Sequence, residues 1–308
     1  MSILVTGADG FAGSHLVKAL LSAGHRVTGT RIEPRAGSPV LSQAEHDQVK
    51  WVTMDLQRSD SVRDAIREDY HAVVHLAAVS GSRDAGADAG YAWAVNAGGT
   101  ARLLDALVSR NSEALILIVS SSVVYGEGDG SPAREGNPAK PLSAYAATKL
   151  GTEVCAEQFA RQHNLPVIVA RPWPHTGPHQ QRGRLITEWL ARLRGGETRV
   201  EFGDPDAIRD YLDVRDVARA YVAMLERGTR GQTYNVASGT GMSFREMFSR
   251  LAAAAGVPAE LVAAPRRRRG WDEQYSVGDS TRLRNETGWA PQYALDQTFR
   301  DMVHAQTN

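Results

Sequence analysis

A glycine triplet close to the amino terminus constrains the fold of this chain more than any other feature. An apolar run over residues 3–5 leads into Gly7, Gly10 and Gly13, and apolar residues then recur at helical spacing over 11–21. This pattern predicts a strand, a tight turn and a helix. In such a turn the first glycine permits the reversal, the second lets a pyrophosphate approach the backbone, and the third lets the helix pack closely. The alternative is an ordinary strand-turn-helix connection that binds no dinucleotide.

Strands and helices alternate behind this turn. Apolar or β-branched runs predict strands at 25–30, 49–54, 72–76 and 114–119, with helices at 59–68 and 91–110. The polar, glycine-rich stretch 79–90 is predicted to be a loop. The alternation predicts a doubly wound parallel α/β sheet of the Rossmann type. We expect residues 1–170 to form this dinucleotide-binding domain, together with part of 207–236. Beyond residue 177 the alternation is less regular, so 171–308 would mainly form a smaller, mixed α/β substrate-binding domain that is discontinuous. Within it a helix is predicted over about 181–194, with Arg182 and Arg184 near its start.

The overall charge limits the classes of partner. The 308 residues include 35 basic and 35 acidic side chains, so nothing favours a nucleic acid or an acidic membrane. No stretch approaches the roughly 20 apolar residues of a membrane span, and the chain does not open with a basic segment and an apolar signal core. The single Cys155 suits a reducing cytoplasm, and no cysteine or histidine cluster has metal-site spacing. We expect a cytoplasmic protein without a metal.

The residue that ends the second strand bears on the identity of the dinucleotide. Arg31 follows Gly7 by 24 residues (31 − 7), close to the spacing of the residue that contacts the adenine ribose. An acidic residue there would bind the ribose 2′-hydroxyl of NAD, whereas a basic one accommodates the 2′-phosphate of NADP. Arg31, with Arg35 as a second charge, therefore predicts NADP(H), with NAD as the alternative. The other interpretation of Arg31 is a solvated surface arginine. Asp55, at the end of the third strand, can accept from an adenine amino group.

A second cluster of polar residues suggests acid–base chemistry. Three serines, 120–122, follow the fifth strand, and Tyr145 and Lys149 lie four residues apart in a predicted helix. A nearby ammonium favours phenolate over phenol, so we expect Lys149 to lower the pKa of Tyr145 and make it a general acid or base. The alternative is an accidental spacing on a helix surface. His75, inside a strand, is predicted to be a hydrogen-bonded core histidine.

Together these residues resemble the extended short-chain dehydrogenase/reductase superfamily, specifically its nucleotide-sugar epimerases, dehydratases and reductases. The matching segments are 6–13, 55–56, 75–78, Asn96, 120–122, 125–126, 145–149, 171–172 and 209–211. The resemblance implies that Ser121, Tyr145 and Lys149 are catalytic and that Lys149 also holds the nicotinamide ribose. It implies further cofactor contacts from Asp9, Phe11, Ala12, Leu56, Leu76, Ala77, Ala78, Asn96, Pro172 and His175. The implied substrate contacts are Ser80, Ser122, Arg182, Arg209 and Arg269.

Departures from the family pattern narrow the reaction. Dehydratases of this family carry an acid pair directly after the residue that corresponds to Ser121, and here those positions hold Ser122 and Val123. This argues against dehydration and leaves 4-epimerisation or net reduction of a 4-keto sugar. Arg31 favours the reductase, because a net reductase draws on NADPH. The segment 171–178 resembles that of GDP-mannose dehydratases and GDP-4-keto-6-deoxy-mannose reductases, although Trp173 and Pro174 replace the commoner Phe-Asn pair.

Two further expectations concern partners and activity. The resemblance implies a homodimer formed through the helices near 91–110 and 145–163, with a GDP- or dTDP-activated 4-keto-6-deoxyhexose as substrate. A third reading, a noncatalytic dinucleotide-binding protein, would be indicated by loss of Tyr145 or Lys149, and both are present.

Overall fold

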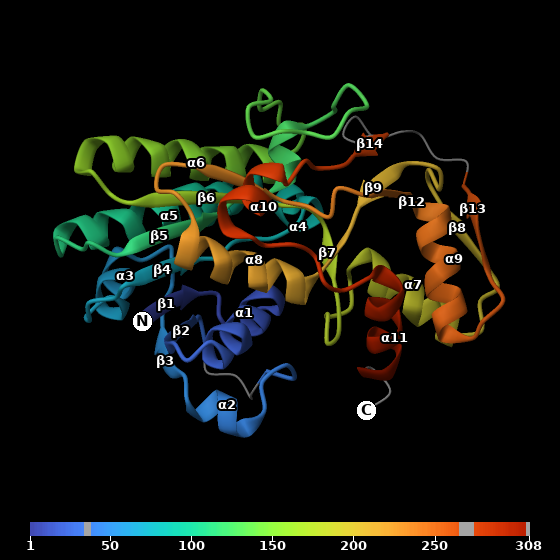
Figure 1. The fold of residues 1–308 in the computed structure, drawn as a ribbon, viewed down its shortest axis with the longest axis horizontal. Helices are drawn as coiled ribbons and strands as arrows, with labels where there is room; N and C mark the ends of the chain where they lie inside the picture. Colours follow the sequence, from blue (N-terminus) through green and yellow to red (C-terminus); the bar gives the residue numbers. More distant parts are fainter. Residues whose placement is uncertain (34–37, 265–273, 306–308) are drawn as a thin grey trace.

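A seven-stranded parallel sheet lies at the centre of the computed structural model, which describes residues 1–33, 38–264 and 274–305 (Figure 1). The strand order is β11-β6-β5-β4-β1-β2-β3. The strands are β1 (Ser2–Thr6), β2 (Arg26–Arg31), β3 (Lys50–Thr53), β4 (Ala72–His75), β5 (Leu115–Val119), β6 (Val167–Pro172) and β11 (Thr233–Val236). The chain reverses direction across the sheet between β1 and β4, the position at which doubly wound sheets bind ligands. The predicted doubly wound sheet is confirmed.

Helices cover both faces of this sheet (Figure 1). One face is covered by α1 (Phe11–Ser22), α8 (Val214–Arg227) and α10 (Thr281–Thr287), whose apolar side chains share one core with β1 and β2. The other face is covered by α3 (Ser59–Ala65), α5 (Ala89–Ser109) and α6 (Ala144–His163), which form a second core with β4 and β5. The central strands are buried on both sides: all residues of β4, and all but the first of β1 and β5, are buried, whereas edge strand β3 has no buried residue.

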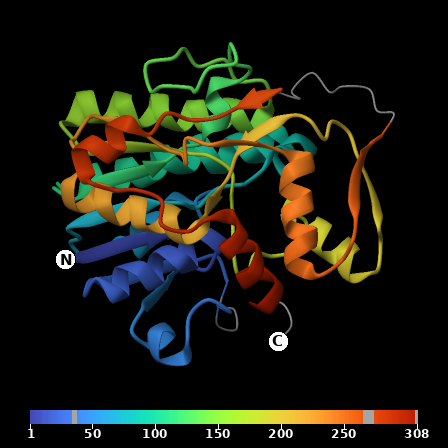
Figure 2. The ribbon, with the colours of Figure 1, turned by 45° about the vertical axis from the view of Figure 1, so that its right-hand side comes forward.

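The later part of the chain forms a smaller mixed α/β assembly beside the carboxyl edge of the sheet, on the right of Figure 2. Its helices are α7 (Leu185–Arg194), α9 (Phe244–Ala255) and α11 (Leu295–Ala305). Among its short strands, β13 (Glu260–Ala263) pairs with β8 (Arg199–Phe202), and β9 (Ile208–Asp210) lies between β12 (Gly241–Ser243) and β14 (Tyr275–Ser276) and pairs with both. Trp189 anchors its core and meets Phe202, Phe244 and Phe248 edge to face. The strands β7 (His175–Thr176) and β10 (Leu212–Asp213) pair with each other in a separate two-stranded parallel sheet.

Two predicted boundaries differ from the structure. The stretch predicted as a loop over 79–90 contains a short helix, α4 (Ser82–Ala87), because Ala85 is buried against the body of the protein. A separate five-residue helix, α2 (Gln43–Asp47), precedes β3. Residues 181–184 do not belong to α7, since Arg184 has extended backbone angles and serves as the N-cap of that helix.

Candidate active site

The glycine turn between β1 and α1 forms an open cradle at the carboxyl edge of the sheet. Gly7 has a φ of +66°, which favours glycine, and a Cβ there would lie 3.0 Å from the backbone of Ala77. A Cβ on Gly13 would lie 2.9 Å from the Cα of Ala8 and closer still to the carbonyl oxygen of Gly7. Gly10 is the N-cap of α1, and no side chain caps the helix. The first N–H groups of α1, next to Asp9 and including that of Ala12, are therefore suited to phosphate oxygens.

Polar groups at neighbouring strand ends hold this cradle in place. The Thr6 hydroxyl oxygen accepts from the N–H groups of Leu76 (3.1 Å) and Ala77 (3.0 Å), which joins the end of β1 to the segment after β4. His75 bonds to Thr6 at 2.8 Å and to Thr100 at 3.1 Å. Burial lowers the pKa of His75 to about 3, so the ring is neutral. The prediction of a hydrogen-bonded core histidine is confirmed.

Arg31 ends β2 beside the glycine turn. The Gly7 N–H donates to the Thr30 hydroxyl at 3.3 Å, which places the end of β2 next to the turn. Arg31 is partly exposed, and its guanidinium carbon lies 5.2 Å from the centre of the Trp51 ring. A stacked guanidinium at this position fits the 2′-phosphate of NADP. Arg35, the second predicted charge, lies outside the described residues.

Asn96 and Leu56, both expected near the cofactor, are buried in the protein's own structure. The Asn96 amide oxygen accepts from the Val79 N–H at 2.8 Å, and its nitrogen donates to the Thr148 hydroxyl at 2.9 Å. Asn96 thereby braces the segment after β4 against α6. Leu56 belongs to the core under α5, whereas Asp55 and Ala78 remain partly exposed at the strand ends.

Ser121, Tyr145 and Lys149 meet at the end of β5. Ser121 precedes the 3₁₀ helix η1 (Ser122–Tyr125), where its hydroxyl accepts from the Val123 N–H at 3.4 Å, and the interaction of Ser121 with Tyr145 acts to lower the pKa of that phenol. Tyr145 lies in the first turn of α6, and Lys149 follows one turn later. Lys149 is only 5% exposed, and its ammonium donates to the Val119 carbonyl at 2.8 Å. The structure thus brings together the three residues that the sequence suggested for chemistry.

The expected effect of Lys149 on Tyr145 is wrong for this structure. Burial raises the pKa of Tyr145 above its ordinary value of 10, opposed by the Ser121 hydrogen bond and by the charge of Arg184. The Lys149 ammonium donates to the Val119 carbonyl, and the effect of burial on the pKa of Tyr145 prevails. Burial also lowers the pKa of Lys149 itself to about 8. Tyr145 is accordingly a protonated phenol at neutral pH, which suits a proton donor.

An aromatic contact connects the glycine turn to the later part of the chain. The rings of Phe11 and His175 stack with centroids 6.4 Å apart, and His15 meets Phe11 edge to face at 5.3 Å. His15 Nε2 bonds to the carbonyl of Pro178 at 3.2 Å, and burial lowers the pKa of His15 to about 4. The neutral His15 therefore donates this bond. Pro172, the last residue of β6, is buried just before this segment.

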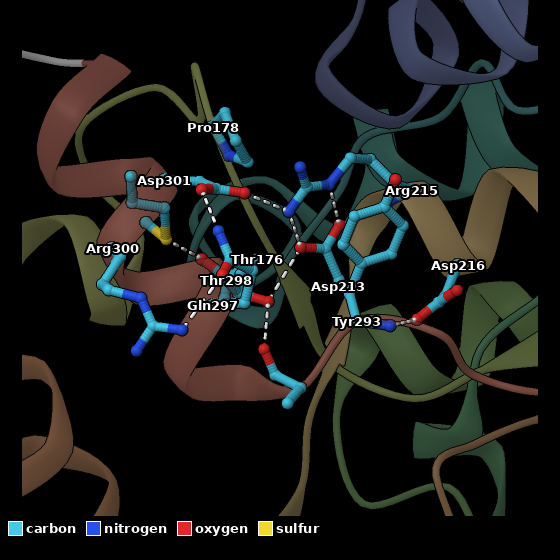
Figure 3. A network of polar contacts seen from close by, with 12 residues as sticks. Thr176, Pro178, Asp213, Arg215, Asp216, Tyr293, Gln297, Thr298, Arg300 and Asp301 are labelled. Carbon is cyan, nitrogen blue, oxygen red and sulfur yellow. Dashed lines mark hydrogen bonds and ion pairs between the residues drawn. The ribbon is translucent and has the colours of Figure 1, made fainter.

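A buried polar network holds β10 in place beside β7, the strand that carries His175 (Figure 3). Asp213 at the end of β10 accepts from Arg215 Nε at 2.9 Å and from the Thr298 hydroxyl at 2.8 Å. Arg215 also pairs with Asp301 at 2.8 Å and lies over the Tyr293 ring, 3.8 Å from its centre. These contacts fix α11 against β10, whose partner β7 carries His175.

The residues predicted to bind the substrate are not brought together as closely as Ser121, Tyr145 and Lys149. Ser80 accepts from Arg184 at 2.9 Å, and Arg184 also lies 3.8 Å from Asp84, so Ser80 contacts the start of α7. Arg209 donates to the Ile208 carbonyl and lies over the Phe244 ring, and Arg182 is exposed before α7. Ser122 is only 5% exposed in η1, so the structure does not present it as an open substrate contact, contrary to expectation. Arg269 lies outside the described residues.

Sequence reasoning overlooked three residues next to this site. His15 follows Phe11 by four residues, and Glu153 follows Lys149 by four, so helical spacing could have flagged both. Arg184 was noted only as part of a helix start, and no spacing could have revealed its contact with Ser80, 104 residues away.

The described residues offer neither a membrane-spanning helix nor a metal site. Within them, no helix is long and apolar enough to cross a membrane, and no group of three or more histidine, cysteine, aspartate or glutamate side chains is arranged to hold a metal ion. Cys155 is half-buried, and burial raises the pKa of its thiol, which does not favour a nucleophile.

Comparisons with known proteins agree with this geometry. The model of the NAD dependent epimerase/dehydratase family matches residues 3–237. GDP-6-deoxy-D-mannose reductase of Pseudomonas aeruginosa is 35% identical, and the alignment covers 98% of this chain and 95% of the relative. UDP-glucose 4-epimerase of Mycolicibacterium smegmatis is 33% identical over 98% of this chain and 97% of the relative.

A solved structure shares the whole architecture. The structure of RMD from Pseudomonas aeruginosa complexed with NADPH is 33% identical and superimposes with a TM-score of 0.84, covering 99% of this chain and 98% of that one. The glycine cradle, the doubly wound sheet and the cluster at the end of β5 accompany similarity over nearly the entire length. The chain therefore belongs to the NAD dependent epimerase/dehydratase family, of the extended short-chain dehydrogenase/reductase type.

Proposed function

We propose that this enzyme uses NADPH to reduce the 4-keto group of a GDP- or dTDP-activated 4-keto-6-deoxyhexose. The observation that carries the proposal is the guanidinium of Arg31 at the end of β2, next to the glycine cradle. A cation there favours NADPH, the cofactor from which a net reductase draws hydride. Similarity to the Pseudomonas aeruginosa reductase and to the NADPH-bound structure supports the same reaction.

Each part of the site has a task in this reaction. The N–H groups at the start of α1 bind the pyrophosphate, Arg31 binds the 2′-phosphate, and Lys149 binds the nicotinamide ribose. Bound NADPH supplies the hydride that C4 of the sugar receives. Tyr145 donates its phenolic proton to the C4 oxygen, which becomes a hydroxyl, and the phenolate regains a proton from solvent. Ser121 donates a hydrogen bond to the same oxygen and so orients the ketone.

The substrate nucleotide would be bound by the later part of the chain. We assign Arg209 and Arg269 to its diphosphate, because a guanidinium can donate to phosphate oxygens in a bidentate manner. Ser80 and Arg182 would complete the substrate contacts. This assignment rests on the division into a cofactor domain over 1–170, with part of 207–236, and a substrate domain mainly over 171–308. An enzyme that draws on the cellular NADPH pool would work in the cytoplasm.

The direct test is NADPH oxidation by the purified protein with GDP- and dTDP-4-keto-6-deoxyhexoses. We expect loss of NADPH absorbance with at least one of these sugars. Tyr145→Phe should abolish most turnover while NADPH binding persists. Tyr70→Phe, just before the amino end of the central strand β4 and so away from the carboxyl edge of the sheet, should retain turnover. No oxidation with any such sugar would refute the proposed reaction, and full activity of Tyr145→Phe would refute the role of Tyr145. A protein that binds NADPH without any turnover would instead be a noncatalytic dinucleotide-binding protein.

A nucleotide-sugar 4-epimerase that retains NAD is the second candidate. It is favoured by the 33% identity to the Mycolicibacterium smegmatis UDP-glucose 4-epimerase and needs the same three residues at the end of β5. The two candidates differ in the cofactor that accompanies the protein. Stoichiometric NAD released on denaturation would identify the epimerase, whereas a protein that exchanges NADPH freely would be the reductase.

We also propose that two copies associate through α5 and α6. Trp93 of α5 is 44% exposed and Val154 of α6 is 57% exposed, and the Trp93 ring packs over Gly151, one turn before Val154. These exposed apolar groups lie on the helices through which family members are expected to dimerise. Val154→Asp should shift the mass measured by light scattering from dimer to monomer. Ile32→Asp, an equivalent change at an exposed residue elsewhere, should leave the mass unchanged, and a Val154→Asp dimer would contradict this interface.

A further inference from the structure

Lys149 of the proposed site is buried in surroundings that disfavour its protonated form. Lys149 is 5% exposed, and the Val119 carbonyl accepts from its ammonium at 2.8 Å. Burial lowers the pKa of Lys149 to about 8, close to neutral pH, and the charge of Glu153 opposes this effect. Lys149 can bind ribose hydroxyls as a cation only while it stays protonated, so a neighbouring anion matters for its task.

Glu153 lies one helical turn after Lys149 and is firmly held. It is 8% exposed, and its carboxylate accepts from Arg171 Nε at 2.9 Å and from Arg171 Nη2 at 2.6 Å. Arg171, 9% exposed on β6, also donates to the Glu135 carbonyl at 3.3 Å and lies 4.8 Å from the centre of the Tyr125 ring. A bidentate, nearly fully buried pair of this kind keeps the carboxylate in one place.

The other groups around Lys149 cannot supply the negative charge. From β4, His75 is neutral, since burial and then the charge of Lys149 lower its pKa to about 3. On α6 itself, Tyr145 is a protonated phenol. From β6, Arg171 carries positive charge, and β5 contributes the uncharged Val119 carbonyl. Glu153 is the anion of this set.

We propose that Glu153, fixed by Arg171, is a positioning residue that keeps Lys149 cationic and thereby sets the upper pH limit of NADPH binding. This inference rests on the role of Lys149 in the proposed function. A carboxylate one turn along the same helix face lies within the range over which charges in a protein interact strongly. Tyr145, Lys149 and Glu153 then form a series along α6 in which each residue has a different task.

Two substitutions distinguish an effect of Glu153 on the charge of Lys149 from a purely stabilising role of the Glu153–Arg171 pair. Glu153→Gln removes the anion, so Lys149 should lose its proton at a pH lower by about one unit. Arg171→Gln removes the compensating cation and leaves the anion, so Lys149 should titrate no lower than in the unmodified protein. If the pair only stabilised the fold, both variants would unfold more easily, and neither would move the titration of Lys149.

NMR can follow this titration without any substrate. The sequence contains four lysines, Lys18, Lys50, Lys140 and Lys149, so selectively ¹³C-labelled lysine gives few signals. The signal absent from Lys149→Met identifies Lys149. In parallel, NADPH binding measured by fluorescence should weaken at a lower pH in Glu153→Gln than in the unmodified protein. Unchanged pH dependence of both the NMR signal and NADPH binding in Glu153→Gln would overturn the inference.

A second variant covers the case in which Glu153→Gln does not fold. Glu153→Gln combined with Arg171→Met removes both buried charges, so it leaves no unpaired ion. In this double variant the pKa of Lys149 should be lower than in the unmodified protein and higher than in Glu153→Gln. The reason is that, of the two charges removed, the negative charge of Glu153 is the nearer to Lys149. An unmoved titration here would also overturn the inference. The NMR shift does not depend on turnover, so failure of the proposed reaction, seen as no NADPH oxidation with any sugar, is a separate result.

Discussion

Replacing Gly13 by alanine tests the geometry of the glycine cradle directly. Gly13 lies in the first turn of α1, where helix packing leaves no room for a side chain. A Cβ there would lie 2.9 Å from the Cα of Ala8 and from the carbonyl carbon of Gly7, and closer to the Gly7 carbonyl oxygen. All three neighbours are backbone atoms, which cannot rotate out of the way. Either α1 moves away from β1, or the turn proposed to bind the pyrophosphate is distorted.

The size of the effect follows from two opposing terms. Alanine gains about 0.5–1 kcal/mol over glycine inside a helix, because glycine loses more backbone entropy on folding. Overpacking costs about 1–3 kcal/mol, and contact with rigid backbone places Gly13→Ala near the upper end. The expected net loss is about 2 kcal/mol, or a fall in Tm of about 3 °C for a chain of this length.

A matched substitution isolates the packing term. A Cβ on Gly86, in α4, would meet nothing within 4 Å, so Gly86→Ala should keep or slightly raise the free energy of unfolding. Thermal melts of both variants give the stability, and fluorescence titration gives the NADPH affinity. We expect Gly13→Ala to lose both stability and NADPH affinity. A Gly13→Ala protein with unchanged Tm and unchanged affinity would refute the close packing of α1 on the turn.

Two other predictions concern charge. Arg31→Asp should weaken NADPH binding relative to NADH by about 10-fold or more, since one charged hydrogen bond contributes about 1.5–3 kcal/mol. Arg26→Asp, at the other end of β2, should leave this ratio unchanged. An unaltered ratio of the two dissociation constants would show that Arg31 is an ordinary surface residue. His15 has a pKa of about 4 in the folded chain and near 6.5 when unfolded, so the unfolded chain binds its proton first as pH falls. Stability should therefore fall by about 3 kcal/mol between about pH 6.5 and pH 4 on account of His15. Urea unfolding of His15→Gln should show a smaller loss over that range, and an equal loss would contradict the assignment.

Local patterns were sufficient to predict the sheet and its ligand-binding edge. The glycine triplet, the apolar strand runs and the basic residue after the second strand depend on spacing along the chain, and spacing is what a sequence displays. Within 79–90 the same reasoning failed, because α4 forms through burial of Ala85 rather than through a strong helical pattern. The start of α7 was misplaced because the extended backbone of Arg184 depends on capping within the folded chain.

The sequence alone determined the alternation of strands and helices around the sheet, the cradle for a dinucleotide, and the Tyr145 and Lys149 pair on one helix face. The tertiary structure decided the electrostatic state of that pair. It directs Lys149 to a carbonyl 30 residues away, pairs Glu153 with Arg171 across 18 residues, and places the charge of Arg184 near Tyr145. A pKa depends on burial and on distances through space, which spacing along one helix does not specify. For this reason the sequence suggested the reacting groups, and the fold settled which of them is protonated at neutral pH.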